Sequence, residues 1–248
     1  MNLTLDIGNT AVKWATFEGR TPLDFGGWKA GEATAEQLAG VGRLAAEADG
    51  VLACASGTMP RLGFAVPTLE ATMPLPIKID YKTPATLGAD RIADACGAAG
   101  LHPGQPCLVI DAGTCVTVDF IDGQGTYHGG AIMPGLGMSL RALNSFTARL
   151  PLVDIEATRR APVLGRSTEE CILAGTVGAT MLALAGFVAL YKEKAPGLRV
   201  LLTGGDAQHL AGEGHNGWEC VPNLALAGLN EVLLANSANC KNSTKERI

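Results

Sequence analysis

The chain has 248 residues, of which 47% are hydrophobic and 17% charged, and its formal net charge is −5. This composition is typical of a globular protein with one large or two small domains, and it excludes an intrinsically disordered chain. No run of Lys and Arg exceeds two residues, so the sequence carries no basic stripe and we expect no nucleic-acid partner.

The seven cysteines are odd in number, form no C-x-x-C pair and lie mostly in apolar runs. This pattern predicts free thiols and argues against disulfides and a zinc site. The first residues, MNLTLDIGNT, have neither the basic nor the apolar region of a signal peptide. We also expect no apolar stretch of about 18 residues without polar breaks. The sequence therefore predicts a reduced, cytoplasmic protein without a membrane partner.

An internal repeat is the most informative feature of the chain. LTLDIGNTAVKWATFEG at residues 3–19 aligns with LVIDAGTCVTVDFIDG at residues 108–123. Each copy predicts an apolar strand that ends near an Asp, a glycine turn and a second strand. Two copies about 100 residues apart indicate two homologous domains that face one cleft. The domains are predicted at residues 1–105 and 106–240, followed by a polar tail at 241–248.

The other predicted elements make the fold α/β, because strands and helices alternate along the chain. Helices are predicted at 31–49 and 89–102, a buried strand at 51–56, a glycine-rich loop from 129 that enters a helix ending before Pro151, a buried core or interface helix at 168–195, a strand–turn–helix unit at 199–210, and a frayed end from 237.

The motif D-I-G-N-T at residues 6–10 suits a metal-bound polyphosphate. Backbone N–H groups and Thr10 can donate to phosphate, Asp6 can hold Mg²⁺ directly or through water, and Lys13 can meet a phosphate as a point charge. Alone, this motif would equally describe an ordinary hairpin turn. The second copy, D-A-G-T at 111–114, and T-G-G-D at 203–206 together favour a nucleotide site, since glycines let the backbone lie flat against a ligand.

These three motifs resemble the phosphate-1, phosphate-2 and adenosine elements of the actin/hexokinase/Hsp70-like superfamily. Within it, the chain resembles type III pantothenate kinase in five strings, the last of which contains the T-G-G-D motif. They are Y-K-T-P-A-T-L-G-A-D-R at 81–91, G-G-A-I-M-P-G at 129–135, T-A-R-L-P at 147–151, G-R-S-T at 165–168 and T-G-G-D-A at 203–207. The resemblance extends in order from residue 3 to about residue 230.

The resemblance implies ATP-dependent phosphorylation of pantothenate, the first step of coenzyme A biosynthesis. It also implies a homodimer of duplicated ribonuclease-H-like domains with mixed sheets flanking an ATP cleft, and a need for Mg²⁺ and a monovalent cation, K⁺ or NH₄⁺. By motif, ATP would be bound by Asp6, Ile7, Gly8, Asn9, Thr10, Ala11, Val12, Lys13 and Thr114. Pantothenate would be bound by Tyr81, Gly88, Ala89, Asp90, Arg91 and Thr168.

Three carboxylates receive distinct roles from the resemblance. Asp90 would be the proton acceptor, Asp6 would lie nearest Mg²⁺, and Asp111 would bind the monovalent cation. One departure from the family is Cys115, where Ala is frequent. We expect little effect from it, because the two residues are similar in size.

The chemistry of phosphoryl transfer agrees with these roles. The reaction needs charge neutralisation, in-line positioning and a group that orients the attacking hydroxyl. In the pair Asp90-Arg91, the carboxylate can accept a hydroxyl proton while the guanidinium pairs with an anion. Whether Arg91 meets the carboxylate of pantothenate or orients Asp90 stays open, and alone the pair would also suit a helix start with an exposed salt bridge.

The sequence lacks the motifs of transition-metal sites, of covalent catalysis by serine and of P-loop kinases. The four histidines show no metal-binding spacing, and the chain has neither a G-x-S-x-G elbow nor a P-loop. Two alternatives remain open: an enzyme of the same fold with another acceptor, such as acetate, a sugar or water attacking polyphosphate, and a nucleotide-binding regulatory protein that assists transcription. The joint presence of Asp6, Asp90 and Asp111 favours an enzyme.

Overall fold

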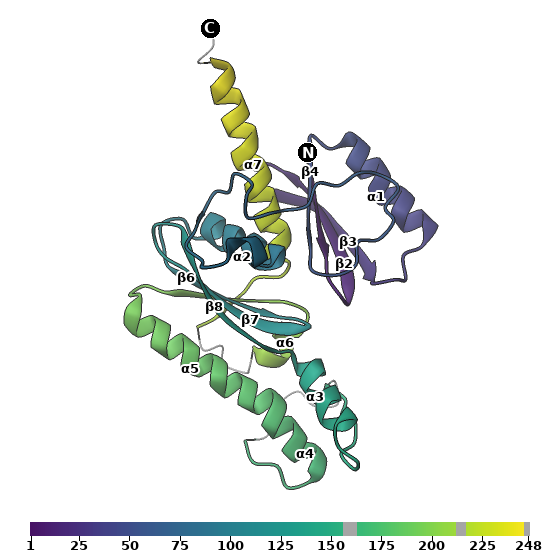
Figure 1. Ribbon diagram of the computed structural model, residues 1–248, viewed down its shortest axis with the longest axis vertical. Helices are drawn as coiled ribbons and strands as arrows, with labels where there is room; N and C mark the ends of the chain where they lie inside the picture. Colours follow the sequence, from purple (N-terminus) through teal and green to yellow (C-terminus); the bar gives the residue numbers. More distant parts are fainter. Residues whose placement is uncertain (156–162, 212–216, 246–248) are drawn as a thin grey trace. The chain divides into compact units, whose positions relative to one another are not determined.

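The computed structural model describes residues 1–155, 163–211 and 217–245. The chain divides into two compact units, each with its own sheet and helices (Figure 1). Unit 1 comprises Met1–Gly104, Gly125–His128 and Asn223–Ile248, and unit 2 comprises Gln105–Gln124 and Gly129–Pro222. The α/β fold class is confirmed, while the predicted division into domains 1–105 and 106–240 with a tail at 241–248 stays a prediction.

Unit 1 is a mixed sheet of order β3-β2-β1-β4, in which β1 is antiparallel to β2 and parallel to β4. Its elements are β1 (Asn2–Ile7), β2 (Ala11–Glu18), β3 (Thr21–Lys29), α1 (Ala35–Glu47), β4 (Gly50–Ala55), β5 (Lys78–Ile79), the 3₁₀ turn η1 (Pro84–Thr86), α2 (Ala89–Leu101) and α7 (Leu224–Lys245). The helices predicted at 31–49 and 89–102 and the strand predicted at 51–56 are confirmed. The expectation of a frayed end from 237 is wrong, because α7 continues to Lys245.

Alternate residues of β1 face opposite sides of the sheet. Leu3 and Ile7 are fully buried and belong to one hydrophobic cluster with Val41 of α1. On the other face, the Asn2 side-chain amide donates to Asn230 Oδ1 of α7 at 2.9 Å. The sheet is therefore covered by α1 on one face and by α7 on the other (Figure 1).

Helix α2 packs against α7 at backbone contact distance. A Cβ atom on Gly228 would come within 1.7 Å of the Ala93 carbonyl oxygen, and one on Gly97 within 2.7 Å of the Leu224 carbonyl oxygen. Any larger residue at either position would force the helices apart. Helix α2 also contacts β4, the strand next to β1 in the sheet.

Unit 2 is built on a sheet whose strand order is β10-β9-β6-β7-β8-β5, where β5 and the start of β8 belong to unit 1. Its elements are β6 (Cys107–Ala112), β7 (Cys115–Ile121), β8 (Thr126–Pro134), α3 (Leu136–Ser145), α4 (Thr168–Leu173), the π-helical turn η3 (Ala174–Gly178), α5 (Ala179–Lys194), β9 (Arg199–Thr203), α6 (Ala207–Leu210) and β10 (Glu219–Cys220).

The prediction of a glycine-rich loop from residue 129 is wrong, because residues 129–134 continue strand β8. Gly130 is required there by strand packing, since a Cβ atom would lie 1.7 Å from the Val118 carbonyl oxygen. The helix predicted to end just before Pro151 is α3, and it already ends at Ser145. The strand–turn–helix unit predicted at 199–210 is confirmed as β9 and α6.

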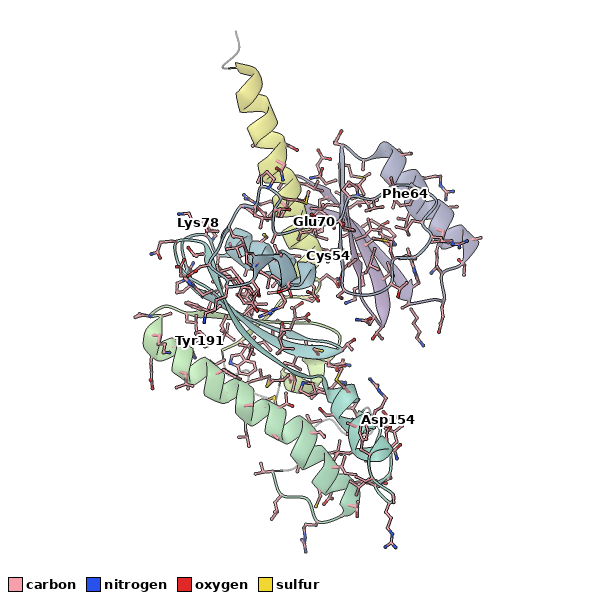
Figure 2. All side chains as sticks on the ribbon, in the orientation of Figure 1. Cys54, Phe64, Glu70, Lys78, Asp154 and Tyr191 are labelled. Carbon is pink, nitrogen blue, oxygen red and sulfur yellow. The ribbon has the colours of Figure 1, made fainter. Side chains whose placement is uncertain are left out.

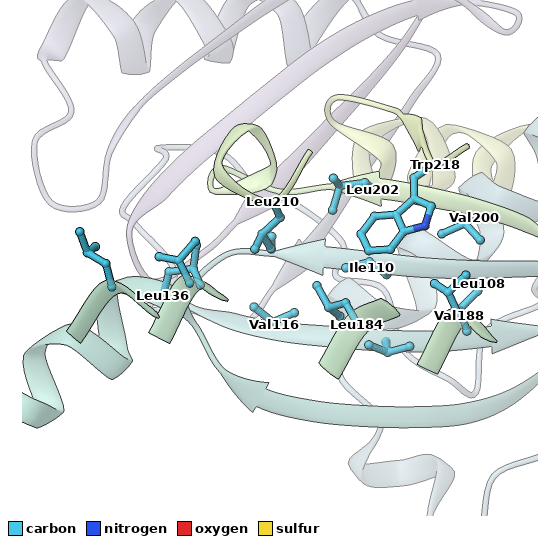
Figure 3. Close-up of a cluster of buried hydrophobic side chains, with 14 of the residues drawn as sticks. Leu108, Ile110, Val116, Leu136, Leu184, Val188, Val200, Leu202, Leu210 and Trp218 are labelled. Atoms are coloured by element: carbon cyan, nitrogen blue, oxygen red, sulfur yellow. The ribbon is translucent and has the colours of Figure 1, made fainter. Parts of the chain in front are cut away.

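The core of unit 2 lies between its sheet and helix α5 (Figure 3). Ile110 of β6 and Leu184 of α5 are fully buried in it, and Trp218 is 7% exposed. The opposite side of α5 exposes Leu182 and Leu190, at 71% and 57%. The helix predicted at 168–195 is thus buried along one face only.

The segment Thr168–Lys194 is long and apolar enough to cross a membrane by length and composition alone. The expectation that no stretch of about 18 residues is free of polar breaks is a stricter criterion, and it stays a prediction, since Thr176 and Thr180 interrupt this segment. The core helix of a soluble protein passes the same test, and one face of this segment packs on the sheet of unit 2.

The predicted internal repeat has a structural counterpart in the two sheets. Strand β6 is antiparallel to β7 and parallel to β9, as β1 is to β2 and β4. The turns after the two aspartates differ in length by one residue. In the first the Gly8 N–H donates to the Ala11 carbonyl, and in the second the Gly113 N–H donates to the Cys115 carbonyl. The two sheets thus have the same arrangement of these three strands.

Candidate active site

A row of three side chains crosses the sheet of unit 1 at Asp6. Asp6 of β1 pairs with Lys13 of β2 on one side and with Cys54 of β4 on the other. Directly paired residues project from the same face of a sheet, and the Cys54 thiol donates to Asp6 Oδ1 at 3.4 Å. Cys54 is fully buried and lies in the interior of unit 1 (Figure 2). Sequence motifs identify Asp6 and Lys13 but give no signal for Cys54.

The surroundings of Asp6 disfavour its negative charge. Burial raises the pKa of the Asp6 carboxyl, the Cys54 thiol and the Lys13 ammonium lower it, and the Asp90 carboxylate raises it further. Burial, together with Asp6, Asp90 and Asp94, holds the pKa of the Cys54 thiol well above its usual range, so Cys54 is a neutral donor. Asp6 is thus a largely buried carboxyl group with a raised pKa and charged neighbours, which is typical of a functional site.

The turn after Asp6 is braced by the loop that follows β4. The N–H groups of Ser56 and Gly57 both donate to the Ile7 carbonyl, at 3.0 and 2.9 Å. The Asn9 side-chain amide donates to the Ser56 carbonyl at 3.2 Å. A Cβ atom on Gly57 would lie 2.4 Å from the Gly8 carbonyl oxygen. Gly57 is therefore a supporting residue that no sequence motif revealed.

The predicted ATP-binding residues of unit 1 differ in exposure. Asn9 and Thr10 are exposed at the tip of the turn, whereas the side chains of Ile7 and Val12 are buried in the core. Residues 7, 11 and 12 can therefore contribute to a phosphate site through their backbone and not through their side chains.

The predicted acceptor-binding residues gather at the start of α2. Gly88 is the N-cap residue of this helix, and Asp90 lies in its first turn. Asp90 Oδ1 accepts a hydrogen bond from the Arg91 backbone N–H at 2.9 Å. A Cβ atom on Gly88 would stand 2.5 Å from that same oxygen, so glycine is needed for the carboxylate to lie there. The Arg91 guanidinium lies over the Tyr81 ring, 6.0 Å from its centroid.

In unit 2, the Asp111 carboxylate lies against a glycine turn. Asp111 of β6 pairs with Thr117 of β7 and with Thr203 of β9. Gly204 has a φ of +96°, and its Cβ would come within 2.4 Å of Asp111 Oδ1 and 2.2 Å of the Ala112 carbonyl oxygen. A carboxylate and a carbonyl oxygen therefore converge beside Gly204, where only glycine fits.

The two remaining predicted residues lie elsewhere in unit 2. Thr114 belongs to the β6–β7 turn, where its carbonyl accepts from the Gly135 N–H at 3.1 Å. Thr168 is the first residue of α4, directly after the N-cap residue Ser167, whose hydroxyl accepts from the Glu170 N–H at 3.2 Å. The structure thus brings Asp6, Lys13, Asp90, Tyr81 and Arg91 together in unit 1, and it places Asp111, Thr114 and Thr168 in unit 2.

Other sequence expectations concern cysteines and histidines. Six cysteines are free thiols, and Cys54, Cys96 and Cys107 are buried. His215 and the side chain of Cys240 lie outside the described residues. Within the described ranges, no group of three or more His, Cys, Asp or Glu side chains could enclose a metal ion.

Comparison with solved structures supports the fold. A Baf family transcriptional activator from Campylobacter jejuni superposes with a TM-score of 0.57 at 20% identity, covering 95% of this chain and 99% of its own. An activator of 2-hydroxyisocaproyl-CoA dehydratase from Clostridium difficile, solved with bound ADPNP, gives a TM-score of 0.54 at 18% identity over 99% of this chain and 97% of its own. At this identity the similarity shows the fold, which is that of the actin-like ATPases.

Comparison of sequences reaches further. The family model for type III pantothenate kinase matches residues 2–190. A type III pantothenate kinase from Bacteroides fragilis is 40% identical over 211 residues, which cover 83% of this chain and 86% of the relative. Another from Christiangramia forsetii is 35% identical over 242 residues, covering 94% and 98%. The matched residues 2–190 lie in both units and include Asp6, Asp90 and Asp111. The chain belongs to the type III pantothenate kinase family.

Proposed function

We propose that the chain phosphorylates pantothenate through Asp90, with Arg91 as the receptor for the acceptor's carboxylate. Pantothenate kinases transfer the γ-phosphoryl group of ATP to pantothenate, and this is the reaction of the family to which the chain belongs. The observation that carries the assignment is that the turn after Asp6 and the start of α2, where Asp90 lies, belong to one compact unit. The effect of the Asp90 carboxylate, which raises the pKa of Asp6, agrees with this placement.

In the proposed mechanism, Asp90 accepts the proton of the primary hydroxyl of pantothenate as that oxygen attacks the γ-phosphorus. The hydrogen bond from the Arg91 N–H fixes the Asp90 carboxylate at the start of α2. Positioned proton acceptors contribute about 10²–10⁴-fold to such reactions. Tyr81, Gly88, Ala89 and Thr168 complete the proposed acceptor site.

The turn from Asp6 to Lys13 would hold the phosphates of ATP, with Thr114 as a further contact. The Thr10 hydroxyl and the backbone N–H groups of the turn are donors suited to phosphate oxygens, and the Lys13 ammonium adds a positive charge. The brace from Ser56 and Gly57 would hold the turn in place before ATP binds. Such preorganisation reduces the cost of binding.

Mg²⁺ fits the donor set at Asp6. Protein-bound Mg²⁺ usually keeps several waters and takes one or two carboxylates together with substrate phosphates. Asp6 supplies one carboxylate, and the described residues offer no three-ligand cluster that would enclose the ion. A cation bound there would supply charge neutralisation for the phosphates, and it would also offset the burial that raises the pKa of Asp6.

A monovalent cation fits Asp111. Asp111 Oδ1 and the Ala112 carbonyl oxygen lie on the same side of Gly204, 2.4 and 2.2 Å from where a Cβ atom would stand. They are two oxygen ligands of the kind that a loosely coordinated cation takes, and a loose site would suit K⁺ or NH₄⁺ better than the smaller, more strongly hydrated Na⁺. Asp111 would hold this ion and thereby offset part of the negative charge of ATP.

We further propose a homodimer and a cytoplasmic location, without nucleic-acid or membrane partners. The family is one of soluble metabolic kinases. The exposed side of α5, with Leu182 and Leu190, is apolar and continuous with a helix whose other side forms the core of unit 2. In the proposed homodimer, a second copy of the chain would bury this apolar face of α5 in the interface.

The cation proposal is tested by initial rates of phosphopantothenate formation in KCl, NH₄Cl or NaCl at constant ionic strength. We expect activity in K⁺ and NH₄⁺, poor activity in Na⁺, and loss of this selectivity in Asp111→Asn. Asp122→Asn is the matched control, because Asp122 is an acidic residue of the same unit outside the proposed site. Equal rates of the wild-type protein in all three salts would contradict a specific site at Asp111.

A further inference from the structure

Two tyrosine rings face the Arg91 guanidinium in unit 1. The Arg91 Cζ atom lies 6.0 Å from the Tyr81 ring centroid and 5.9 Å from the Tyr127 ring centroid. The two rings are 6.0 Å apart and inclined by 54°. Tyr127 is fully buried, and Arg91 is 7% exposed. Arg91 is therefore a buried cation whose surroundings include two aromatic faces.

Strand pairing brings Tyr127 to this position. Strand β5, which begins at Lys78 (Figure 2), runs parallel to the start of β8, with Ile79 opposite Tyr127. The Asp80 N–H donates to the Tyr127 carbonyl at 2.9 Å. Next to this contact, His128 Nδ1 lies 3.2 Å from Asp80 Oδ2. Tyr81 directly follows the paired segment, so the backbone fixes both tyrosines relative to each other.

This geometry limits how the Arg91 side chain can turn. A guanidinium is planar, binds aromatic faces through cation–π attraction and presents its N–H groups along its edges. Two adjacent rings packed against the guanidinium remove rotamers that a free arginine would sample, so less entropy is lost when the fork binds an anion. Asp90 takes its hydrogen bond from the Arg91 backbone and not from the guanidinium. The positioning of Asp90 therefore does not depend on the contact between the Arg91 guanidinium and the two tyrosine rings.

We propose that Tyr127 is a positioning residue that orients the Arg91 guanidinium toward the carboxylate of pantothenate. Tyr81 is the second ring, beside Tyr127, and the pair makes the site selective for an acceptor with a carboxylate at this end. This inference rests on the proposed function, in which Arg91 receives that carboxylate. It assigns to Tyr127 a role in specificity and not in the transfer of the phosphoryl group.

The test compares two acceptors, pantothenate and its alcohol analogue, in which –CH₂OH replaces the carboxylate. In Tyr127→Leu we expect KM for pantothenate to rise by about 2- to 30-fold, as the loss of one cation–π contact implies, with kcat within about threefold. The kcat/KM for the alcohol analogue should stay unchanged. Tyr127→Phe keeps the ring and should behave like the wild type toward both acceptors.

Two further variants keep the test decisive. Tyr127→Met fills a similar volume without an aromatic face and replaces Tyr127→Leu if the latter does not fold. Arg91→Lys keeps the charge without the planar fork and should show the same selective loss for pantothenate. Tyr191→Leu is the matched control, since the Tyr191 ring belongs to unit 2 and packs on the Phe120 ring, with 5.1 Å between the two ring centroids.

The possible results separate this inference from the proposed function. Equal losses for both acceptors in Tyr127→Leu and Tyr127→Met would overturn the positioning role and leave Tyr127 as a core residue. A loss of pantothenate selectivity in Tyr127→Phe would also overturn it, because the ring would then not be the acting group. A wild-type protein that phosphorylates neither acceptor would instead contradict the proposed function.

Discussion

Replacing Asp90 by Asn removes the proposed proton acceptor with little change in shape. Asp90 Oδ1 accepts from the Arg91 N–H at 2.9 Å, and the amide oxygen of Asn can accept the same hydrogen bond. The start of α2 should therefore be preserved, with a free energy of unfolding within about 0.5 kcal/mol of the wild type. The change is confined to the basicity and the charge of one side chain.

The expected kinetic effect follows from the role and from the neighbouring charge. Loss of a positioned base lowers kcat by about 10²–10⁴-fold, which corresponds to about 2.7–5.4 kcal/mol in activation free energy. The Asp90 charge also raises the pKa of Asp6, so its removal favours the ionised form of Asp6. We therefore expect KM for Mg·ATP to stay constant or fall while kcat drops.

The assay is ADP release in a coupled system at saturating ATP, with pantothenate varied. Asp24→Asn is the matched control, because Asp24 Oδ1 accepts from the N–H of the next residue, Phe25, at 2.8 Å, in the pattern of Asp90. Asp24 is exposed on β3 and should retain wild-type kcat. A value of kcat within threefold of the wild type in Asp90→Asn would refute the assignment of Asp90 as the base.

Two further predictions concern the Asp6 turn. Asp6→Asn should be inactive with Mg·ATP and pantothenate. In thermal unfolding at pH 7 without nucleotide or Mg²⁺, it should nevertheless be more stable than the wild type, because burial raises the pKa of Asp6 and the folded state therefore disfavours its charge. Asp6 is protonated in both folded and unfolded chains below its unfolded value near 3.8. The wild type thus loses stability relative to the variant as pH rises through the folded pKa, and the difference should vanish toward low pH; a less stable variant at pH 7 would contradict this. Gly57→Ala places a Cβ 2.4 Å from the Gly8 carbonyl oxygen and should raise KM for ATP more than tenfold at nearly constant KM for pantothenate. Gly40→Ala in α1, where the Cβ meets only Arg43 Nη2 at 3.9 Å, is the control and should keep wild-type kinetics, so equal KM values for ATP in the two variants would contradict the bracing role of Gly57.

Much of the fold follows from local sequence signals. The apolar strands that end near Asp6 and Asp111 each carry their own turn signal, so both hairpins are predicted from the repeat alone. Helix α2 begins at Ala89 as predicted, with Gly88 as its N-cap residue and alanine, the best helix former, recurring along it. Residues whose role is carried by such a local motif could therefore be found from sequence.

The parts that sequence analysis missed depend on neighbours that are distant in the chain. Gly130 is predicted in a loop, yet it lies in β8, and it is a glycine because the backbone of β7 approaches it too closely for any side chain. Cys54 and Tyr127 acquire their positions from the strands beside them, opposite Asp6 and Ile79. Neither residue belongs to a motif, and both look like ordinary core residues in the sequence. Tertiary pairing, and not local pattern, gives these residues their place in the site.

The measurement that tests the central claim most directly counts ADP and phosphorylated acceptor in the same reaction. The wild-type protein is incubated with Mg·ATP in KCl, with pantothenate, with acetate, with a hexose or without an acceptor, and the products are identified by mass spectrometry. A pantothenate kinase whose base is Asp90 should release ADP only with pantothenate and yield one 4′-phosphopantothenate per ADP, and Asp90→Asn should yield almost none. ADP release at the same rate without pantothenate, or equal rates with acetate or a hexose, would contradict the account.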